Sequence, residues 1–126
     1  MEPGLHGFHV TQYGEISSGC DAAGSLIIIL LNHTSWRTKR HVGDLGNIEA
    51  DLSGIALVKK LDYQIKLSGK YSVIGRSLLI HQKEDDLGLG GNAESLETGN
   101  AGKRLACAVI TLSQETDIRG FNPNYH

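Results

Sequence analysis

The sequence predicts a single all-β domain, either a sandwich or a barrel. Its 126 residues suit one domain, and 16 of them are glycine, nearly twice the average share of about 7 %. Glycine supplies the positive-φ positions that tight turns need, so this usage favours short strands joined by loops. The sequence shows no long amphipathic helix pattern, no repeat and no proline-rich linker.

The strand signal is strongest where apolar or β-branched residues alternate with polar ones. Five predicted strands follow from it: Phe8–Tyr13, Gly54–Leu61, Tyr63–Leu67, Val73–His81 and Arg104–Leu112. The first places Val10 on one face of a sheet, with His9 and Thr11 on the other. The second and third read as a pair joined by a tight turn near Asp62. The long polar segment between the last two predicts a functional or disordered loop.

Charge and hydropathy exclude two classes of protein. A net charge of −2 and a pI of about 6.3 give no overall attraction for nucleic acid or an anionic membrane. The longest apolar run, Leu26–Leu31, is far shorter than the roughly 20 residues of a spanning helix. No signal peptide pattern follows Met1, so nothing marks secretion. We expect a cytoplasmic protein, with an extracellular location as the alternative, that binds neither nucleic acid nor membrane.

Three motifs occur in a specific order. Gly-Leu-His-Gly-Phe-His-Val at 4–10 is followed by Cys20, and His-Val-Gly-Asp-Leu-Gly-Asn follows at 41–47. A run over 75–107 then carries Gly-Arg-Ser, Asp-Asp-Leu-Gly, Thr-Gly-Asn-Ala-Gly and Arg-Leu-Ala-Cys. Together they resemble the copper/zinc superoxide dismutase family. The resemblance implies a Greek-key β-barrel that holds copper and zinc, usually as a homodimer, and disproportionates superoxide to oxygen and hydrogen peroxide.

The resemblance also assigns metal ligands. It implies copper at His9 and His81, and zinc at His41 and Asp44, with a weaker zinc match at His33. Histidine suits this chemistry because neutral imidazole binds both metals.

Further roles follow from the same resemblance. Asp85 matches the carboxylate that ties a copper histidine to a zinc histidine. Arg104 matches the arginine that holds the superoxide anion beside copper. Cys20 and Cys107 match the family's intrasubunit disulfide, although two free thiols are the default for a cytosolic chain.

Three positions depart from the family pattern. Thr11 stands where a second copper histidine is expected, and Leu26 where the imidazole that bridges both metals is expected. Glu97 replaces a lysine that would attract the anion. We therefore predict a damaged metal site and weak or lost dismutase activity.

Two stretches suggest a faulty or decayed gene. The family has three strands before the motif at 4–10, where this sequence has three residues, so the barrel is expected to be incomplete. Residues 25–40 match no family loop, yet suitable codons read in shifted frames would restore the family's Pro-His and His-Gly-Gly-Pro motifs. We interpret 25–40 as the product of frameshifts within one dismutase-like domain spanning 1–126.

Two alternative functions remain open. An inactive homologue would act by pairing with an intact dismutase paralogue, which the depleted ligand set favours. A copper-chaperone domain ranks last, because that family delivers copper through a cysteine pair in its tail, and Ser113–His126 has no cysteine.

Overall fold

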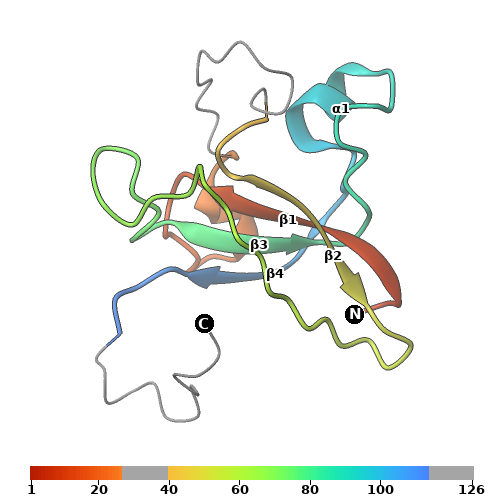
Figure 1. Ribbon diagram of the computed structural model, residues 1–126, viewed down its shortest axis with the longest axis horizontal. Coiled ribbons are helices and arrows are strands. Elements are labelled where there is room, and N and C mark those ends of the chain that lie inside the picture. The colour runs from red at the N-terminus through yellow and green to blue at the C-terminus, as the bar shows by residue number, and fades with distance from the viewer. Residues whose placement is uncertain (27–39, 114–126) are drawn as a thin grey trace.

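The structure is a computed structural model that describes residues 1–26 and 40–113. These residues form one antiparallel sheet with the strand order β2-β1-β3-β4, and within them the sheet does not close into a barrel. Figure 1 shows the strands side by side, with the helix α1 beyond one end of the sheet. The all-β prediction is confirmed. The elements are β1 (Gly4–Thr11), the 3-10 turn η1 (Cys20–Ala23), β2 (Asp44–Ala50), β3 (Ser77–His81), α1 (Ala93–Thr98) and β4 (Arg104–Val109).

β1 is central because it pairs with β2 on one edge and β3 on the other. Its register sets His9 opposite Asp44 of β2 and opposite Leu79 of β3. The register of the β1–β2 pairing shifts between Gly7 and His9. Gly7 itself has no room for a side chain, because a Cβ there would lie 2.9 Å from the Cβ of Ala101. The register therefore places a histidine beside a carboxylate from a different part of the chain.

The two faces of β1 have different surroundings, as the predicted alternation requires. Val10 packs against Val42 and Val73 in the small apolar core. His9 and Thr11 point to the opposite face, where both are buried. This second face carries the candidate site.

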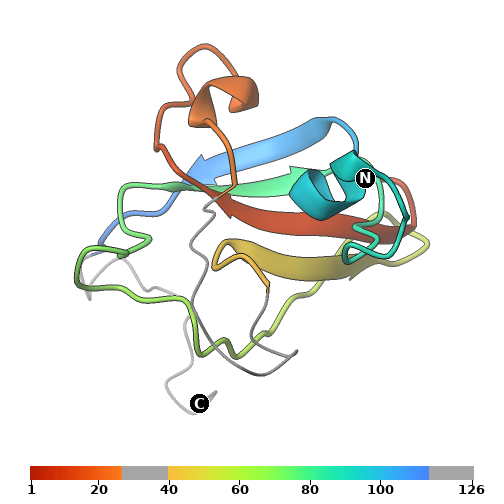
Figure 2. The ribbon, with the colours of Figure 1, turned by 90° about the horizontal axis from the view of Figure 1, so that it is seen from above.

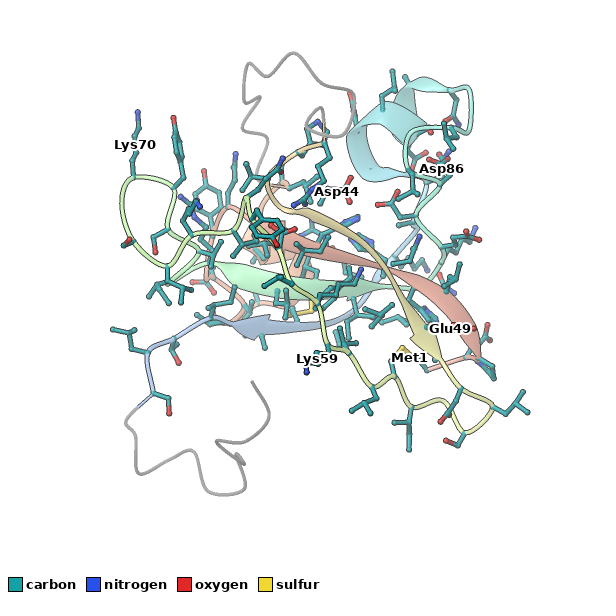
Figure 3. The ribbon with its side chains drawn as sticks, viewed as in Figure 1. Met1, Asp44, Glu49, Lys59, Lys70 and Asp86 are labelled. Atoms are coloured by element: carbon teal, nitrogen blue, oxygen red, sulfur yellow. A yellow bond between two sulfur atoms is a disulfide. The ribbon has the colours of Figure 1, made fainter. Side chains whose placement is uncertain are left out.

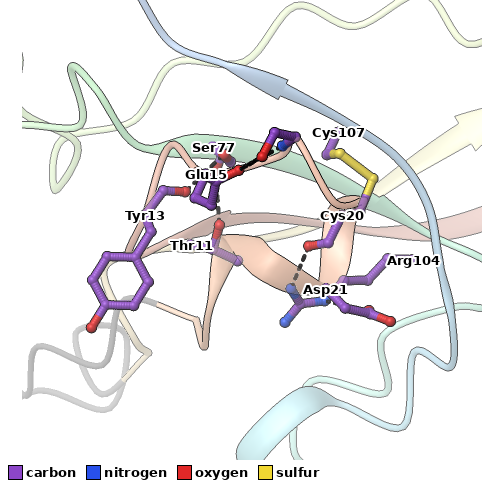
Figure 4. Close-up of a disulfide and its surroundings, with 9 residues drawn as sticks. Thr11, Tyr13, Glu15, Cys20, Asp21, Ser77, Arg104 and Cys107 are labelled. Carbon is purple, nitrogen blue, oxygen red and sulfur yellow. Dashed lines mark hydrogen bonds and ion pairs between the residues drawn. A yellow bond between two sulfur atoms is a disulfide. The ribbon is translucent and has the colours of Figure 1, made fainter.

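A disulfide joins η1 to β4. Cys20 and Cys107 are bonded, with their Cα atoms 5.6 Å apart, which confirms the predicted pairing. Arg104 of β4 donates one hydrogen bond to the Cys20 carbonyl at 2.8 Å and another to the Gly24 carbonyl at 2.6 Å. Figure 4 shows this guanidinium beside the disulfide, and Figure 2 places η1 next to β4. Two side chains of β4 thus anchor the segment that leads to Leu26.

The long loop before β4 is ordered by its own hydrogen bonds. Asn92 caps α1 by accepting from the Ser95 backbone N–H at 2.9 Å, and Gly99 ends the helix in the left-handed region at φ 66°. The Asp86 carboxylate accepts from the Ser95 hydroxyl and the Asn100 amide, both at 2.6 Å. Among the described residues, no helix is long and apolar enough to cross a membrane.

The predicted strand pair over 54–61 and 63–67 is wrong. The segment is irregular, and the β-type pairing that it makes is an isolated bridge between Lys66 and Ser72. Leu57 is 99 % exposed. Alternating apolar residues form a strand when another layer covers one face along its length. Here Ile65 packs against the core, whereas Ile55, Val58 and Leu61 are exposed like Leu57.

Strand boundaries also differ from the predictions. β2 was not predicted, because Asp-Leu-Gly-Asn-Ile-Glu-Ala has few strand-forming residues and its pairing with β1 decides its conformation. β3 begins only at Ser77, since a turn with Gly75 at φ 80° precedes it. β1 begins four residues earlier than the alternation predicted, at Gly4.

Candidate metal centre

His9 lies between two carboxylates. Its Nε2 is 2.6 Å from Asp85 Oδ2 and 4.0 Å from Asp44 Oδ1, and the ligand-type atoms of the three residues all lie within 4.8 Å of one another. Figure 3 marks Asp44 at the start of β2, and His9 and Asp85 are buried. Because Nε2–H donates to Asp85, the lone pair of the neutral imidazole is on Nδ1.

His81 packs beside His9 from the end of β3. The ring centroids are 4.7 Å apart and the planes are inclined by 56°. Nδ1 of His81 donates to the Gly102 carbonyl at 3.0 Å, which leaves the lone pair on Nε2. Burial is the main cause that lowers the pKa of His81, against the Gly102 hydrogen bond, which raises it. Neutral imidazole, the form that binds metals, is therefore favoured.

A third histidine, His6, secures this arrangement from outside the site. Its Nδ1 lies 2.8 Å from the His81 carbonyl and its Nε2 lies 2.8 Å from the Glu2 carbonyl. Both ring nitrogens face backbone oxygens, so His6 joins the strands and is not available as a ligand.

Asp85 is held through its backbone by Asn47, for which no sequence motif indicates a role. The Asn47 amide donates to the Asp85 carbonyl at 2.8 Å, and its oxygen accepts from the Asp85 N–H at 2.7 Å. Asp85 Oδ1 also accepts from the Leu87 N–H at 2.8 Å. A Cβ on Gly99 would lie 1.8 Å from that oxygen, so the end of α1 packs directly on the carboxylate. A side chain that pairs with distant backbone leaves no local sequence signal.

The two predicted zinc ligands face one space. His41 and Asp44 line a cavity of about 650 Å³ together with His9 and Asp85; we call it the outer cavity. A turn brings the two ligands together, since the Asp44 N–H donates to the His41 carbonyl at 3.0 Å. His33 lies outside the described residues.

A second cavity of about 210 Å³ borders the predicted copper ligands. We call it the inner cavity, and its lining includes His9, Thr11, Leu26, His81 and Arg104. The sheet and η1 therefore bring together the predicted copper ligands, the predicted anion-binding arginine and two positions that depart from the family pattern.

Leu26 lies between the two cavities. It lines both of them, is 9 % exposed and pairs with Thr11 through an isolated bridge. The Thr11 hydroxyl is directed to the Ser77 carbonyl at 3.4 Å, as Figure 4 shows. An apolar side chain thus occupies the place where the resemblance puts an imidazole shared by both metals.

The charge around the inner cavity is mixed. Arg104 faces it, but its guanidinium is bonded to two carbonyls, and the exposed carboxylate of Asp21 lies 3.9 Å from its Nε. Glu97 of α1 lines both cavities. An incoming anion therefore meets one arginine and one glutamate in the described lining, which weakens attraction.

The described residues do not fit the full pair of metal sites that the resemblance implies. A tetragonal copper(II) site needs four donors, and the described lining offers the imidazoles of His9 and His81. A structural zinc site also needs four, and the described residues there supply His41 and Asp44. The remaining buried carboxylate, Asp85, is already bonded to His9.

Fold and site together define an all-β protein with imidazoles and carboxylates gathered on one face of an antiparallel sheet. The sequence model of the family described as "Copper/zinc superoxide dismutase (SODC)" matches residues 1–110. The chain belongs to the copper/zinc superoxide dismutase family.

Two curated relatives agree with this assignment, and both are named "Superoxide dismutase [Cu-Zn]". The relative from Paramecium bursaria Chlorella virus 1 is 52 % identical over 112 residues, which cover 87 % of this chain and 60 % of the relative. The relative from Onchocerca volvulus is 48 % identical over 117 residues, which cover 89 % of this chain and 74 % of the relative. The chain thus spans about three-fifths of the length of the viral protein.

Proposed function

We propose that this chain is a dismutase family member in which turnover of superoxide is weak or lost. The observation that carries the proposal is the lining of the inner cavity. Thr11 and Leu26 are buried there beside His9 and His81, at the two places where the resemblance puts further imidazoles. Neither a hydroxyl bonded to backbone nor an alkyl group is a useful copper ligand.

Part of each metal-ligand set is present in this proposal, together with the residues around it. We assign His9 and His81 to copper and His41 and Asp44 to zinc, with Asp85 orienting His9 through the 2.6 Å hydrogen bond. Copper, when bound, supplies one-electron chemistry by alternating between two oxidation states while superoxide becomes oxygen and hydrogen peroxide. Arg104 is the proposed binding group for superoxide, because its planar fork suits a small anion. The incomplete donor set supports no catalytic step.

Metal analysis and a xanthine oxidase–cytochrome c assay on the purified full chain test this proposal. We expect sub-stoichiometric metal and little inhibition of cytochrome c reduction. The matched variant Thr11→His/Leu26→His returns two imidazoles to the inner cavity and is expected to gain activity. Stoichiometric copper with fast turnover in the unmodified chain would contradict the proposal.

The frameshift interpretation of 25–40 is a separate proposal. Sequencing the transcript and the genomic locus from upstream of Met1 through the codon of His41 tests it. Frames that close to Pro-His and His-Gly-Gly-Pro would make this an ordinary dismutase gene behind a faulty record. Confirmation of the printed codons would leave Leu26 in place of the bridging histidine.

A second candidate function is pairing, either of two copies of this chain or with an intact paralogue. It is supported by β2 and β4, which are edge strands of the described sheet, and by exposed apolar side chains such as Leu57 and Leu61. Co-purification of a tagged chain with an active dismutase from its own source would support pairing with a paralogue. A monodisperse monomer with no dismutase bound would contradict both forms.

A further inference from the structure

The charges of this chain are divided between two segments. Residues 52–72 contain four lysines and one acidic residue, Asp62, which forms an ion pair with Arg40. Residues 84–102 contain five acidic residues and neither lysine nor arginine. The overall net charge of −2 hides this division, because the charges of the two segments offset each other in large part. Figure 3 shows Lys59 and Lys70 on the first segment and Asp86 beside α1.

The first segment presents leucines and lysines to solvent. Figure 2 shows it along one side of the sheet, in yellow-green to green. Leu57 is 99 % exposed and Leu61 is 81 % exposed. No carboxylate in the described part of the chain pairs with Lys59 or Lys66. We call its exposed leucines and lysines the basic surface, which comprises Leu57, Lys59, Leu61, Lys66, Leu67 and Lys70.

The loop that contains α1 presents leucines and carboxylates instead. Leu89 is 84 % exposed and Leu96 is 70 % exposed. Asp85 and Asp86 are engaged in hydrogen bonds, whereas the carboxylates of the loop's glutamates form no ion pair within the described residues. We call the exposed leucines and glutamates of this loop the acidic surface, which comprises Glu84, Leu87, Leu89, Glu94, Leu96 and Glu97.

The two surfaces complement each other and neither complements itself. Leucines on both sides offer apolar area whose removal from water is favourable. Lysines opposite glutamates attract, whereas a surface that met its own copy would bring like charges together. Lys60 and Leu87 both line the outer cavity, so the surfaces are neighbours on one chain, yet no ion pair joins them in its described part. A second copy of the chain supplies the complement that each surface lacks.

We propose that the basic surface of one chain docks on the acidic surface of a second copy. The proposed contact rests on the pairing of two copies put forward above, and it names the two surfaces that meet. Because these surfaces differ, the contact is head-to-tail rather than between identical patches. It is also sensitive to salt, since exposed ion pairs are screened.

Sedimentation equilibrium of the purified full chain measures this association. We expect the mean mass to rise with protein concentration at about 0.1 M salt. At about 1 M salt the Debye length falls from about 10 Å to about 3 Å, and the loss of several exposed ion pairs should raise the dissociation constant about 10-fold. Equal or tighter association at the higher salt concentration would overturn the proposal, because the charges would then contribute nothing.

Charge reversal tests which surfaces meet. Lys59→Glu/Lys66→Glu and Glu84→Lys/Glu94→Lys should each be monomeric alone, because each variant brings like charges together. An equimolar mixture of the two variants should associate again, because opposite charges then face each other. The conservative variant Lys59→Arg/Lys66→Arg keeps the charge and should associate as the unmodified chain does.

Two results of this experiment would overturn the proposal. A mixture that stays monomeric would show that the two surfaces do not meet. Association of either charge-reversed variant alone would show that another surface joins the copies, and would leave pairing through the edges of β2 or β4 standing. Far-ultraviolet circular dichroism of every variant establishes that these exposed substitutions leave the fold intact.

The leucines are tested separately. Leu57→Asn/Leu61→Asn removes apolar contact area and should weaken association about 10-fold or more. Leu112→Asn is the matched control, because Leu112 is 83 % exposed and belongs to neither surface. An equal effect of the control would overturn the assignment of the contact to the basic surface.

A different occupant of the basic surface gives a different result. If the unmodified chain stays monomeric at about 0.1 M salt, the proposal is overturned. Co-sedimentation of that monomer with vesicles of phosphatidylcholine and phosphatidylserine, but not of phosphatidylcholine alone, would then assign the surface to an anionic membrane. None of these results bears on the proposed low turnover, which the cytochrome c assay measures independently.

Discussion

The disulfide offers the most direct quantitative test of how this chain is held together. Cys20 and Cys107 are separated by 87 positions, and in the chain-entropy model closing a loop of that size stabilises the folded state by about 4–5 kcal/mol. Domains of this size are stable by only about 5–15 kcal/mol. The double variant Cys20→Ser/Cys107→Ser should therefore lose a large part of the free energy of unfolding.

Urea unfolding followed by circular dichroism measures the loss. With an m-value of about 2 kcal/mol per molar, 4–5 kcal/mol lowers the midpoint by about 2 M. Reductant should lower the midpoint of the unmodified chain by the same amount and leave the double variant unchanged. If the variant is unfolded in buffer, the osmolyte trimethylamine N-oxide should recover its transition. A midpoint shift below about 0.5 M would refute the reasoning, since it would mean that the unfolded chain is not freed by reduction.

Three further outcomes are expected. Arg104→Gln removes two charge-assisted hydrogen bonds, to the carbonyls of Cys20 in η1 and of Gly24 just after it, and should cost about 2–3 kcal/mol in urea unfolding. The exposed neighbour change Lys103→Gln should be neutral. The Ser95 hydroxyl lowers the pKa of Asp86 below its ordinary value of 3.8, so this carboxylate stabilises the loop above about pH 4 and ceases to do so as the pH falls through its folded pKa. Ser95→Ala should raise that pKa in an NMR titration, and an unchanged value would contradict the assignment. Gly99 lies at φ 66° against the buried Asp85 carboxylate, so Gly99→Ala should lower the free energy of unfolding by at least about 1–2 kcal/mol and speed amide hydrogen exchange in α1. Exchange in α1 at the rate of the unmodified chain would contradict this prediction.

The candidate site was predictable where its chemistry is contained in short motifs. His9, Asp44, Asp85 and the disulfide cysteines all stand in such motifs, and the structure brings the first three within 4.8 Å. Asn47 could not be assigned a role in this way, because its two hydrogen bonds reach a residue 38 positions away. Local patterns do not encode such distant pairings.

The fold, too, was predictable from local sequence patterns in some places and not in others. The alternation of residues around Val10 correctly placed Val10 on one face of β1 and His9 and Thr11 on the other. The same kind of pattern over 54–67 predicted strands that do not form: Ile65 packs against the core, but apolar side chains such as Leu57 and Leu61 stay exposed, so no apolar face is covered along the segment. β2, with weak strand propensity, forms because β1 pairs with it.

The sequence by itself determined the family, the all-β class, the disulfide partners and the identities of the side chains available to metals, because these depend on residue type and order. Only the tertiary structure decided where those side chains meet. It showed Leu26 between the two cavities and Arg104 bonded to the η1 segment, and it brought the rings of His9 and His81 side by side. These features depend on strand register and on hydrogen bonds between distant segments, which exist only once the chain has folded.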